Sequence, residues 1–224
     1  MIKLSIALIV LILSSHTFSS WASTPTFKSS EESEWKKIGD EDSILIFSKK
    51  PVDGVLPFKA VGNIDKNINI ILSTLKNHKT KHQWAPKLEK VKLHQQLSDS
   101  DYIFSEYYKT PWPASDREFL LKGEIKKVSS NSYLLLAHSI DKDPNYSRLK
   151  SEDHVQADVK YINLKLTQLA QNKTEIEFEF HGDMNGFMPV WLMNLIQKKW
   201  PLRFIQGLRK QVSASNQAQV ASHP

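Results

Sequence analysis

The chain has 224 residues, a formal net charge of +6 and no cysteine. Its length suits one domain with a sizeable hydrophobic core. The lack of cysteine excludes disulfides, thiol catalysis and cysteine-ligated metals. A basic balance suits anionic partners such as nucleic acid or acidic lipid head groups, although most of the basic residues alternate with acids, as on an ordinary solvated surface.

The first 22 residues have the order of a secretory signal peptide. Lys3 precedes an apolar run from Leu4 to Leu13, and Ser20-Trp21-Ala22 offers small residues for cleavage near Ala22. The run is shorter than the roughly 20 residues that span a bilayer. We therefore expect residues 1–22 to be removed and the protein to be periplasmic or secreted, with a retained anchor as the alternative. Export makes nucleic acid an unexpected partner.

Residues 23–34 are expected to form a flexible leader that ends at the start of a helix. Short apolar strands are predicted at Ile44–Phe47 and Pro57–Ile64. The period then changes to that of a helix, with Asp65 as the expected N-cap. This helix is expected to run towards His82 and to stop near Trp84-Ala85-Pro86. Its apolar face consists of Ile68, Ile71, Leu72 and Leu75.

Period-two alternation dominates the middle of the chain, which indicates antiparallel strands with one buried face. In the second of these strands, Leu120 is the one apolar residue on the charged side. In the fourth, the alternation changes phase between Val159 and Leu164, which predicts a bulge. The expected strands are Tyr102–Lys109, 117–126, Tyr133–Ile140, Val155–Leu169 and 175–181.

A helical stripe returns from Pro189 to Val212, with a kink expected at Pro201. Residues 213–224 are expected to form a disordered tail. The order of elements predicts an α+β fold, in which a curved antiparallel sheet wraps around a long C-terminal helix.

Two segments carry a resemblance to the START (StAR-related lipid transfer) domain family. Pro111-Trp112-Pro113 before Asp116-Arg117-Glu118-Phe119 resembles the loop at the mouth of that family's cavity. The segment 183–194 resembles the family's approach to its C-terminal lid helix. The resemblance covers residues 35–212 and implies a helix-grip fold that encloses a hydrophobic cavity. The matching residues of the second segment are Asp183, Gly186, Pro189, Trp191, Leu192 and Asn194.

Three positions depart from the family's pattern. Met184 stands where relatives often have proline, Gly123 where some have a second cavity arginine, and Gln156 where a further arginine is usual. The resemblance therefore implies a less charged cavity and a neutral, largely apolar ligand.

The residues expected at the site follow from the inward faces of the strands and from the resemblance. The polar contact is expected from Arg117 or His138, although Arg117 could instead brace the loop through Asp116 or Glu118. Each aromatic could equally be plain core. The predicted wall is Phe104, Tyr108, Phe119, Leu121, Phe178, Phe180, Trp191 and Leu195, and the predicted gate is Pro111, Trp112, Pro113, Phe187 and Met188.

The function expected from the resemblance is non-enzymatic binding and transfer of a lipid or sterol-like ligand by a monomer. Trp112 with Lys198, Lys199 and Arg203 could touch a membrane transiently, or the basic residues could be an ordinary solvated helix face. The sequence carries no nucleophile, metal or phosphate-loop motif, so neither a cofactor nor a metal is expected.

Two alternatives stay open. The first is an aromatase/cyclase on the same fold, for which Arg117, His138 and a tyrosine are the visible acid–base candidates. The second is an adaptor module whose cavity is filled by side chains. His78 and His82 have the spacing of metal ligands, but no third ligand lies near them in the sequence.

Overall fold

The computed structural model describes residues 35–52 and 54–221. The predicted signal peptide (1–22), the leader (23–34) and residues 222–224 lie outside this part of the chain. The described strands are β1 (Lys36–Glu41), β2 (Ile44–Ser48), β3 (Phe58–Ile64), β4 (Leu88–Gln96), β5 (Asp101–Tyr108), β6 (Arg117–Ser129), β7 (Ser132–Ser139), β8 (Val155–Gln156), β9 (Asp158–Ala170) and β10 (Lys173–Asp183). The helices are α1 (Ile68–Lys76) and α2 (Val190–Ala221), with short 3-10 turns η1 (Lys81–Gln83) and η2 (Ser147–Leu149).

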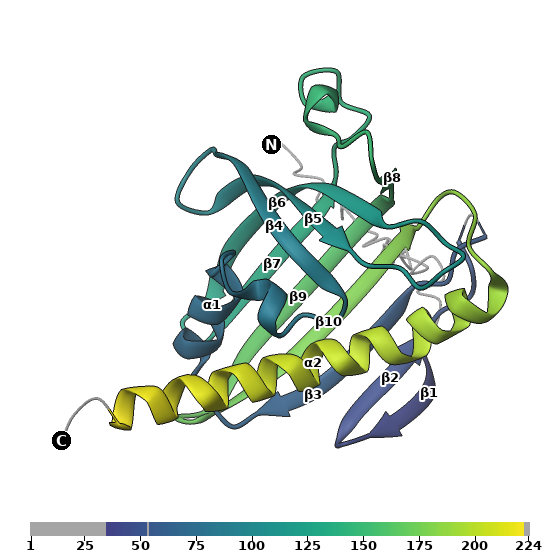
Figure 1. Cartoon of the computed structure of the whole chain (residues 1–224). Coiled ribbons are helices and arrows are strands. Elements are labelled where there is room, and N and C mark those ends of the chain that lie inside the picture. The colour runs from purple at the N-terminus through teal and green to yellow at the C-terminus, as the bar shows by residue number, and fades with distance from the viewer. Residues whose placement is uncertain (1–34, 53, 222–224) are drawn as a thin grey trace, which may run out of the picture. The chain divides into compact units, whose positions relative to one another are not determined.

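The strands form one sheet in the order β1-β2-β3-β10-β9-β7-β6-β5-β4. All neighbours along this path are antiparallel, and β8 pairs in parallel with β6. Figure 1 shows the sheet curling, with α2 lying across its concave side and α1 near one end. This arrangement confirms the predicted α+β fold of a curved sheet around a long C-terminal helix. Within the described ranges, no helix is both long and apolar enough to span a membrane.

Three local predictions were wrong. The leader is followed by the strand β1 instead of a helix, and β4 was not predicted. The N-cap of α1 is Asn67, not Asp65, because the Asn67 side chain accepts a hydrogen bond from the Asn69 N–H at 2.9 Å. The helix α1 ends at Lys76, well before the predicted stop near Trp84-Ala85-Pro86.

The C-terminal helix is also longer than predicted. It runs through Pro201 and continues to Ala221, whereas a disordered tail was expected from Ser213. The reason is composition, because alanine and glutamine favour helix and no glycine or proline follows before Pro224. The hydroxyl of Ser213 also donates to the carbonyl of Arg209 at 2.9 Å, inside the same helix.

The predicted bulge is confirmed in β9. His181 of β10 pairs with Tyr161, whereas the next residue, Gly182, pairs with Val159, so one residue of β9 is left over. Such a bulge bends its strand and increases its twist.

The main core lies between the concave face of the sheet and α2. Phe178 of β10 stacks on Phe204 of α2 with ring centroids 4.6 Å apart. Gly207 lets α2 approach closely, since a Cβ there would lie 2.2 Å from the carbonyl oxygen of Trp84. The side chain of Arg209 connects α2 to the strands β1 to β3. It donates to the backbone carbonyls of Asp42 at 2.7 Å and Asn63 at 2.8 Å.

A second, smaller core lies on the opposite face of β5 and β6. Leu120, the apolar exception in the sequence pattern, packs there with Ile103 and Ile140. Tyr146 and Leu149, from the segment between β7 and β8, pack against this cluster. The exception in the alternation therefore marks where that segment packs on the outer face.

Candidate ligand-binding site

An inner cavity of about 110 Å³ lies between the concave face of the sheet and the helices. Its wall comes mainly from alternate residues of β5, β6, β7, β9 and β10, since side chains of one strand face point the same way. Most of the surface is apolar. Four of the predicted wall residues line it, namely Phe104, Tyr108, Leu121 and Phe178.

One end of the inner cavity is polar, and sequence analysis did not identify it. Glu106 is 2% exposed and forms an ion pair with Lys81, which η1 brings from outside the sheet. The hydroxyl of Tyr108 donates to the other carboxylate oxygen of Glu106 at 2.5 Å. Burial, followed by the charge of Glu106, raises the pKa of Tyr108 well above its ordinary value, so the phenol stays protonated.

His78 lies at the same end of the cavity. Its Nδ1 is buried and has no hydrogen-bond partner in the described part of the chain. Its ring lies 5.5 Å from that of Phe104. Burial, and then the charge of Lys81, holds the pKa of His78 below its ordinary value, so the imidazole is neutral at pH 7.

Two of the departures from the family pattern have clear structural consequences. Gly123 lines the cavity, and a Cβ there would lie 2.8 Å from the ring of Phe104. The glycine thus leaves room for an apolar ring where some relatives have arginine. Gln156 instead bonds Glu118 on the other face of the sheet, so its amide does not contribute to the cavity wall.

An outer groove of about 100 Å³ lies between the loop after β5 and the first turns of α2. Six of the predicted site residues line it, namely Tyr108, Arg117, Phe119, Leu195, Pro111 and Met188. Lys109, Lys199 and Arg203 also line it, so its wall is basic where it is not apolar. Tyr108 and Trp200 line both the groove and the inner cavity.

Arg117 braces the start of α2. Its side chain is 2% exposed and donates to the carbonyl oxygens of Met184 at 3.1 Å, Asn185 at 2.8 Å and Phe187 at 3.1 Å. It also donates to the carbonyl of Ser115 in its own loop. The predicted bracing role is therefore present, but it acts on the 184–187 segment instead of through Asp116 or Glu118.

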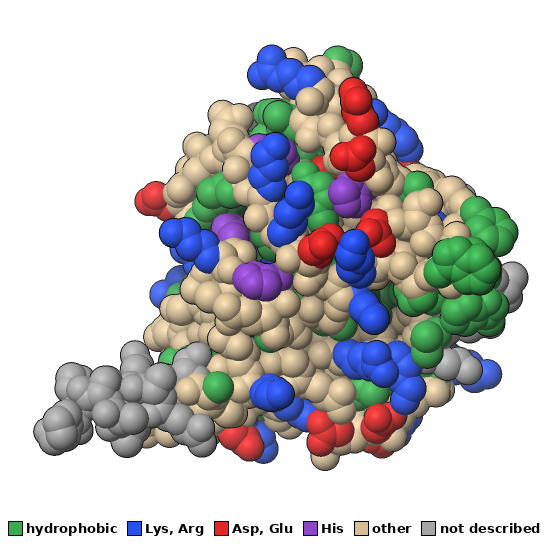
Figure 2. Space-filling model, in the orientation of Figure 1, with side chains coloured by type: hydrophobic (Ala, Val, Ile, Leu, Met, Phe, Trp, Pro, Cys, Tyr) green, Lys and Arg blue, Asp and Glu red, His purple; other side chains and the backbone are tan. Residues whose placement is uncertain are grey.

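Several large apolar side chains stand exposed at the rim of this groove. Trp112 is 89% exposed, Phe187 70%, Trp191 56% and Leu195 46%. The first three are sequence neighbours of groove-lining residues, and Figure 2 shows hydrophobic side chains gathered at one end of the molecule. Trp112 precedes a cis peptide bond to Pro113. The side chain of Lys198 lies outside the described part of the structure.

Three predicted site residues lie elsewhere: the candidate polar contact His138 and the wall residues Trp191 and Phe180. His138 is exposed because it follows Ala137, which faces the cavity, and neighbours on a strand point to opposite faces. Trp191 stands on the rim. Phe180 is buried in the core, where its ring stacks on Phe58 at 5.1 Å and does not line either hollow.

Asp116 anchors the loop that carries Trp112. Its carboxylate accepts from the N–H of Thr110 at 2.8 Å and from the ammonium of Lys109 at 2.9 Å. Burial acts to raise the pKa of Asp116, but the Thr110 N–H and then Lys109 outweigh it and hold the pKa below its ordinary value.

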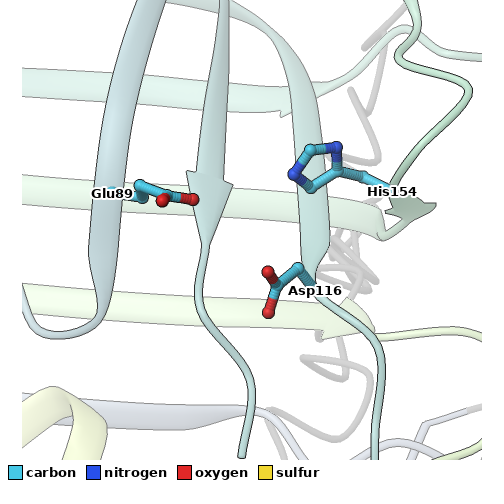
Figure 3. A group of neighbouring side chains, drawn as sticks. All are labelled: Glu89, Asp116 and His154. Atoms are coloured by element: carbon cyan, nitrogen blue, oxygen red, sulfur yellow. The ribbon is translucent and has the colours of Figure 1, made fainter.

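Figure 3 shows Glu89 and His154 turned toward the same carboxylate, and their ligand atoms all lie within 4.8 Å of one another. Lys109 already supplies a cation here, since its ammonium is also 3.7 Å from Glu89. The cluster is therefore explained as an ion-pair anchor for the loop.

The fold and the two hollows define a helix-grip domain with an internal cavity. A sequence model described as the START domain matches residues 28–218, and the chain belongs to that family.

The chain is similar to human StAR-related lipid transfer protein 5, with 15% identity and a TM-score of 0.73 over 84% of this chain and 90% of that one. It is similar to human STARD10, with 14% identity and a TM-score of 0.73 over 88% of this chain and 80% of that one. A STAR-related lipid transfer protein fragment from Xanthomonas axonopodis has 16% identity and a TM-score of 0.68 over 80% and 98% of the two chains. In sequence alone, the chain is 22% identical to the uncharacterized protein PA1579 of Pseudomonas aeruginosa over 79% of this chain and 85% of the relative.

Proposed function

We propose that this protein binds a hydrophobic ligand in the inner cavity and transfers it between membranes without changing it chemically. The observation that carries the proposal is the mainly apolar cavity under α2, whose polar lining includes the ion pair between Lys81 and the buried Glu106. Ligand sites are commonly apolar, with a few polar groups that orient the ligand. Membership of the START family and similarity to lipid transfer proteins support it.

The charges in the cavity favour a neutral amphiphile. Lys81 and Glu106 neutralise each other, so a ligand with its own net charge would meet no unpaired countercharge from them. The unpartnered Nδ1 of His78 can accept from a hydroxyl or amide group of the ligand. Each methylene group that the ligand buries contributes about 0.8 kcal/mol to binding.

The exposed rim supports transfer by direct contact with a bilayer. An indole placed at a loop tip, as in Trp112, is suited to a membrane–water interface. Arg203 lies in the adjoining groove with Lys199, which also forms an exposed ion pair with Glu41 at 3.0 Å, and these cations can attract anionic head groups. We place this activity in the periplasm or outside the cell, on the strength of the N-terminal sequence pattern.

An enzyme on the same fold is the alternative. The acid–base set expected from the sequence is not assembled, because His138 lies on the outer face. The observation that favours the alternative is the hydrogen bond between Tyr108 and Glu106 inside the cavity, since such groups can transfer protons. Recovery of a bound ligand chemically unchanged after prolonged incubation would exclude it for that ligand.

A cavity-filling substitution tests binding. Gly123→Leu places a side chain against Phe104 in the inner cavity, so the variant should lose uptake of a fluorescent lipid from vesicles. Lys122→Leu is the matched control, since residue 122 points to the opposite face of β6 and should keep uptake. Thermal unfolding monitored by circular dichroism establishes that both variants fold. Normal uptake by folded Gly123→Leu would contradict the proposed site.

A further inference from the structure

The inner cavity and the outer groove meet at two aromatic side chains. Tyr108 of β5 and Trp200 of α2 line both hollows. Their rings lie edge to face, with centroids 6.0 Å apart. A ligand that occupies both hollows therefore lies across the boundary that these two rings form.

The side chains of Tyr108 and Trp200 are held in place by different kinds of contact. The hydroxyl of Tyr108 is bonded to Glu106, and its ring lies 4.7 Å from that of Phe119, so the tyrosine is fixed from both ends. Trp200 is held by ring contacts, edge to face with Phe58, Phe178 and Phe180 at 6.0, 5.4 and 5.2 Å and tilted against Phe204 at 6.4 Å.

The backbone beside Trp200 is also less constrained than that of a regular helix. Pro201 has no N–H, so α2 lacks one of its internal hydrogen bonds at this step. Proline is one of the recognised causes of helix bending. Of the two rings at the boundary, that of Tyr108 is additionally anchored by its hydrogen bond to Glu106, so we assign the movement to Trp200.

The sizes of the hollows bear on which ligands can be held. At about 110 and 100 Å³, each is smaller than the engineered cavity of about 150 Å³ that accommodates benzene. A ligand with an acyl chain fits neither alone. It needs both hollows joined end to end, and a path that narrows at one ring suits an elongated molecule better than a broad polycyclic one.

We propose that Trp200 is an internal gate that controls ligand passage between the groove and the inner cavity. The inference rests on the proposed function and deepens it. The ligand is an elongated, neutral, single-chain amphiphile whose polar end reaches Glu106 and whose chain extends past Trp200 into the groove. Displacement of the indole limits the rate at which this ligand enters and leaves.

The kinetic test compares wild type with Trp200→Leu and Trp84→Leu. Trp84 is a matched control because it is buried against the same helix, 5.3 Å from Phe204, yet lines neither hollow. The measurement is stopped-flow uptake of oleoylglycerol, followed by displacement of a pyrene-labelled monoacylglycerol. Minor states of proteins are commonly populated at about 0.1–10%, so removal of the gate should speed uptake about tenfold or more.

The outcomes separate the two proposals. Uptake by wild type at the same rate as by Trp200→Leu overturns the gate while the binding function stands. Failure of all three proteins to bind any monoacylglycerol overturns the proposed ligand class and the gate together. Faster uptake by Trp200→Leu, with Trp84→Leu unchanged, supports the gate.

A second measurement uses the wild-type protein and does not depend on folding of the leucine variant. In protein labelled with fluorotryptophan, saturating oleoylglycerol should shift the fluorine resonance of Trp200 and leave that of Trp84 in place. The conservative variant Trp200→Phe assigns the signal. An unshifted Trp200 resonance in the ligand-saturated protein would overturn the inference.

Discussion

Glu106 is the residue that most restricts the chemistry of the ligand. It lies within the inward row of β5, between Phe104 and Tyr108, and it is buried in contact with Lys81. A buried carboxylate in such a pair is costly to leave without a partner. A ligand group that approaches this end must therefore fit beside the ion pair without separating it.

Substitution of Glu106 tests this role. Glu106→Gln should weaken binding of a monoacylglycerol about tenfold or more, because a hydrogen bond to a charged group is worth about 1.5–3 kcal/mol. Binding of a plain hydrocarbon probe should change much less. Glu89→Gln, an exposed glutamate on the neighbouring β4, is the control. Equal losses for both ligands would show that the substitution damages the fold instead of a specific contact.

His78 should make stability depend on pH. Burial and then Lys81 lower its pKa in the folded protein, so the unfolded chain takes up the proton first as the pH falls. The stability supplied by neutral His78 is complete above about pH 6.5 and is lost as the pH falls through the folded-state pKa.

Urea unfolding across this range provides the measurement. His78→Phe should show a smaller fall in unfolding free energy below about pH 6.5 than wild type. His82→Phe, which replaces an exposed histidine, should follow wild type. The half-buried His94 also has a pKa lowered by desolvation, but it is present in all three proteins and cancels from the comparison. Identical pH profiles for wild type and His78→Phe would contradict the assignment.

Some residues of the site could be predicted from the sequence. Period-two alternation placed Phe104, Tyr108 and Leu121 on the inward face. The same alternation would put Glu106 there, as an acid in an apolar row, but this signal was not used. The role of Lys81 could not be predicted, because its position depends on how η1 packs against β5. Trp200 was missed although Phe204 follows it by one helical turn, a spacing that indicates a shared face.

At the scale of elements, the edge strands show why β1 and β4 escaped prediction. In β4 only Leu88 is buried, and most of the other residues are exposed on both faces. A strand of this kind is held by backbone hydrogen bonds to one neighbour, so its side chains need not alternate. The central strands are packed on one face and were found from their alternation.

The start of α2 depends on Arg117. Replacement by methionine keeps the aliphatic stem but leaves the carbonyls of Met184, Asn185 and Phe187 without their donor. We expect a loss of about 2–4 kcal/mol in unfolding free energy, since several buried polar groups become unsatisfied.

The same change should make the 184–188 segment more sensitive to limited proteolysis. Lys142→Met removes an exposed cation that pairs with Asp158 and should have little effect. Unchanged proteolysis of Arg117→Met at 184–188 would contradict the bracing role.

At the scale of the whole molecule, the exposed rim and the basic groove predict a docking side. Trp112→Ala should lower partitioning to anionic vesicles about tenfold, because insertion of a large apolar side chain is worth about 1.5–3 kcal/mol. Ligand affinity at equilibrium should be unchanged, since Trp112 does not line either hollow.

Val128→Ala, an exposed apolar residue at the other end of β6, is the control for general surface hydrophobicity. Vesicle binding that drops equally in both variants, or in neither, would exclude the rim as the docking side.

The family could be identified from two short segments of the sequence, and the domain match over residues 28–218 confirms it. The division of the interior into two hollows could not be predicted from the sequence. It depends on how the ring of Trp200 in α2 meets the ring of Tyr108 in β5, and these residues are far apart in the chain. The predicted docking through Lys198, Lys199 and Arg203 stays a prediction, and Lys199 and Arg203 lie in the groove.

The central claim is that the inner cavity holds a hydrophobic ligand, and native mass spectrometry tests it most directly. Protein purified gently from its own cells should carry a bound neutral amphiphile, released on solvent extraction and reduced in the Gly123→Leu variant. Repeated recovery of ligand-free wild-type protein that also takes up no monoacylglycerol from vesicles would contradict the account.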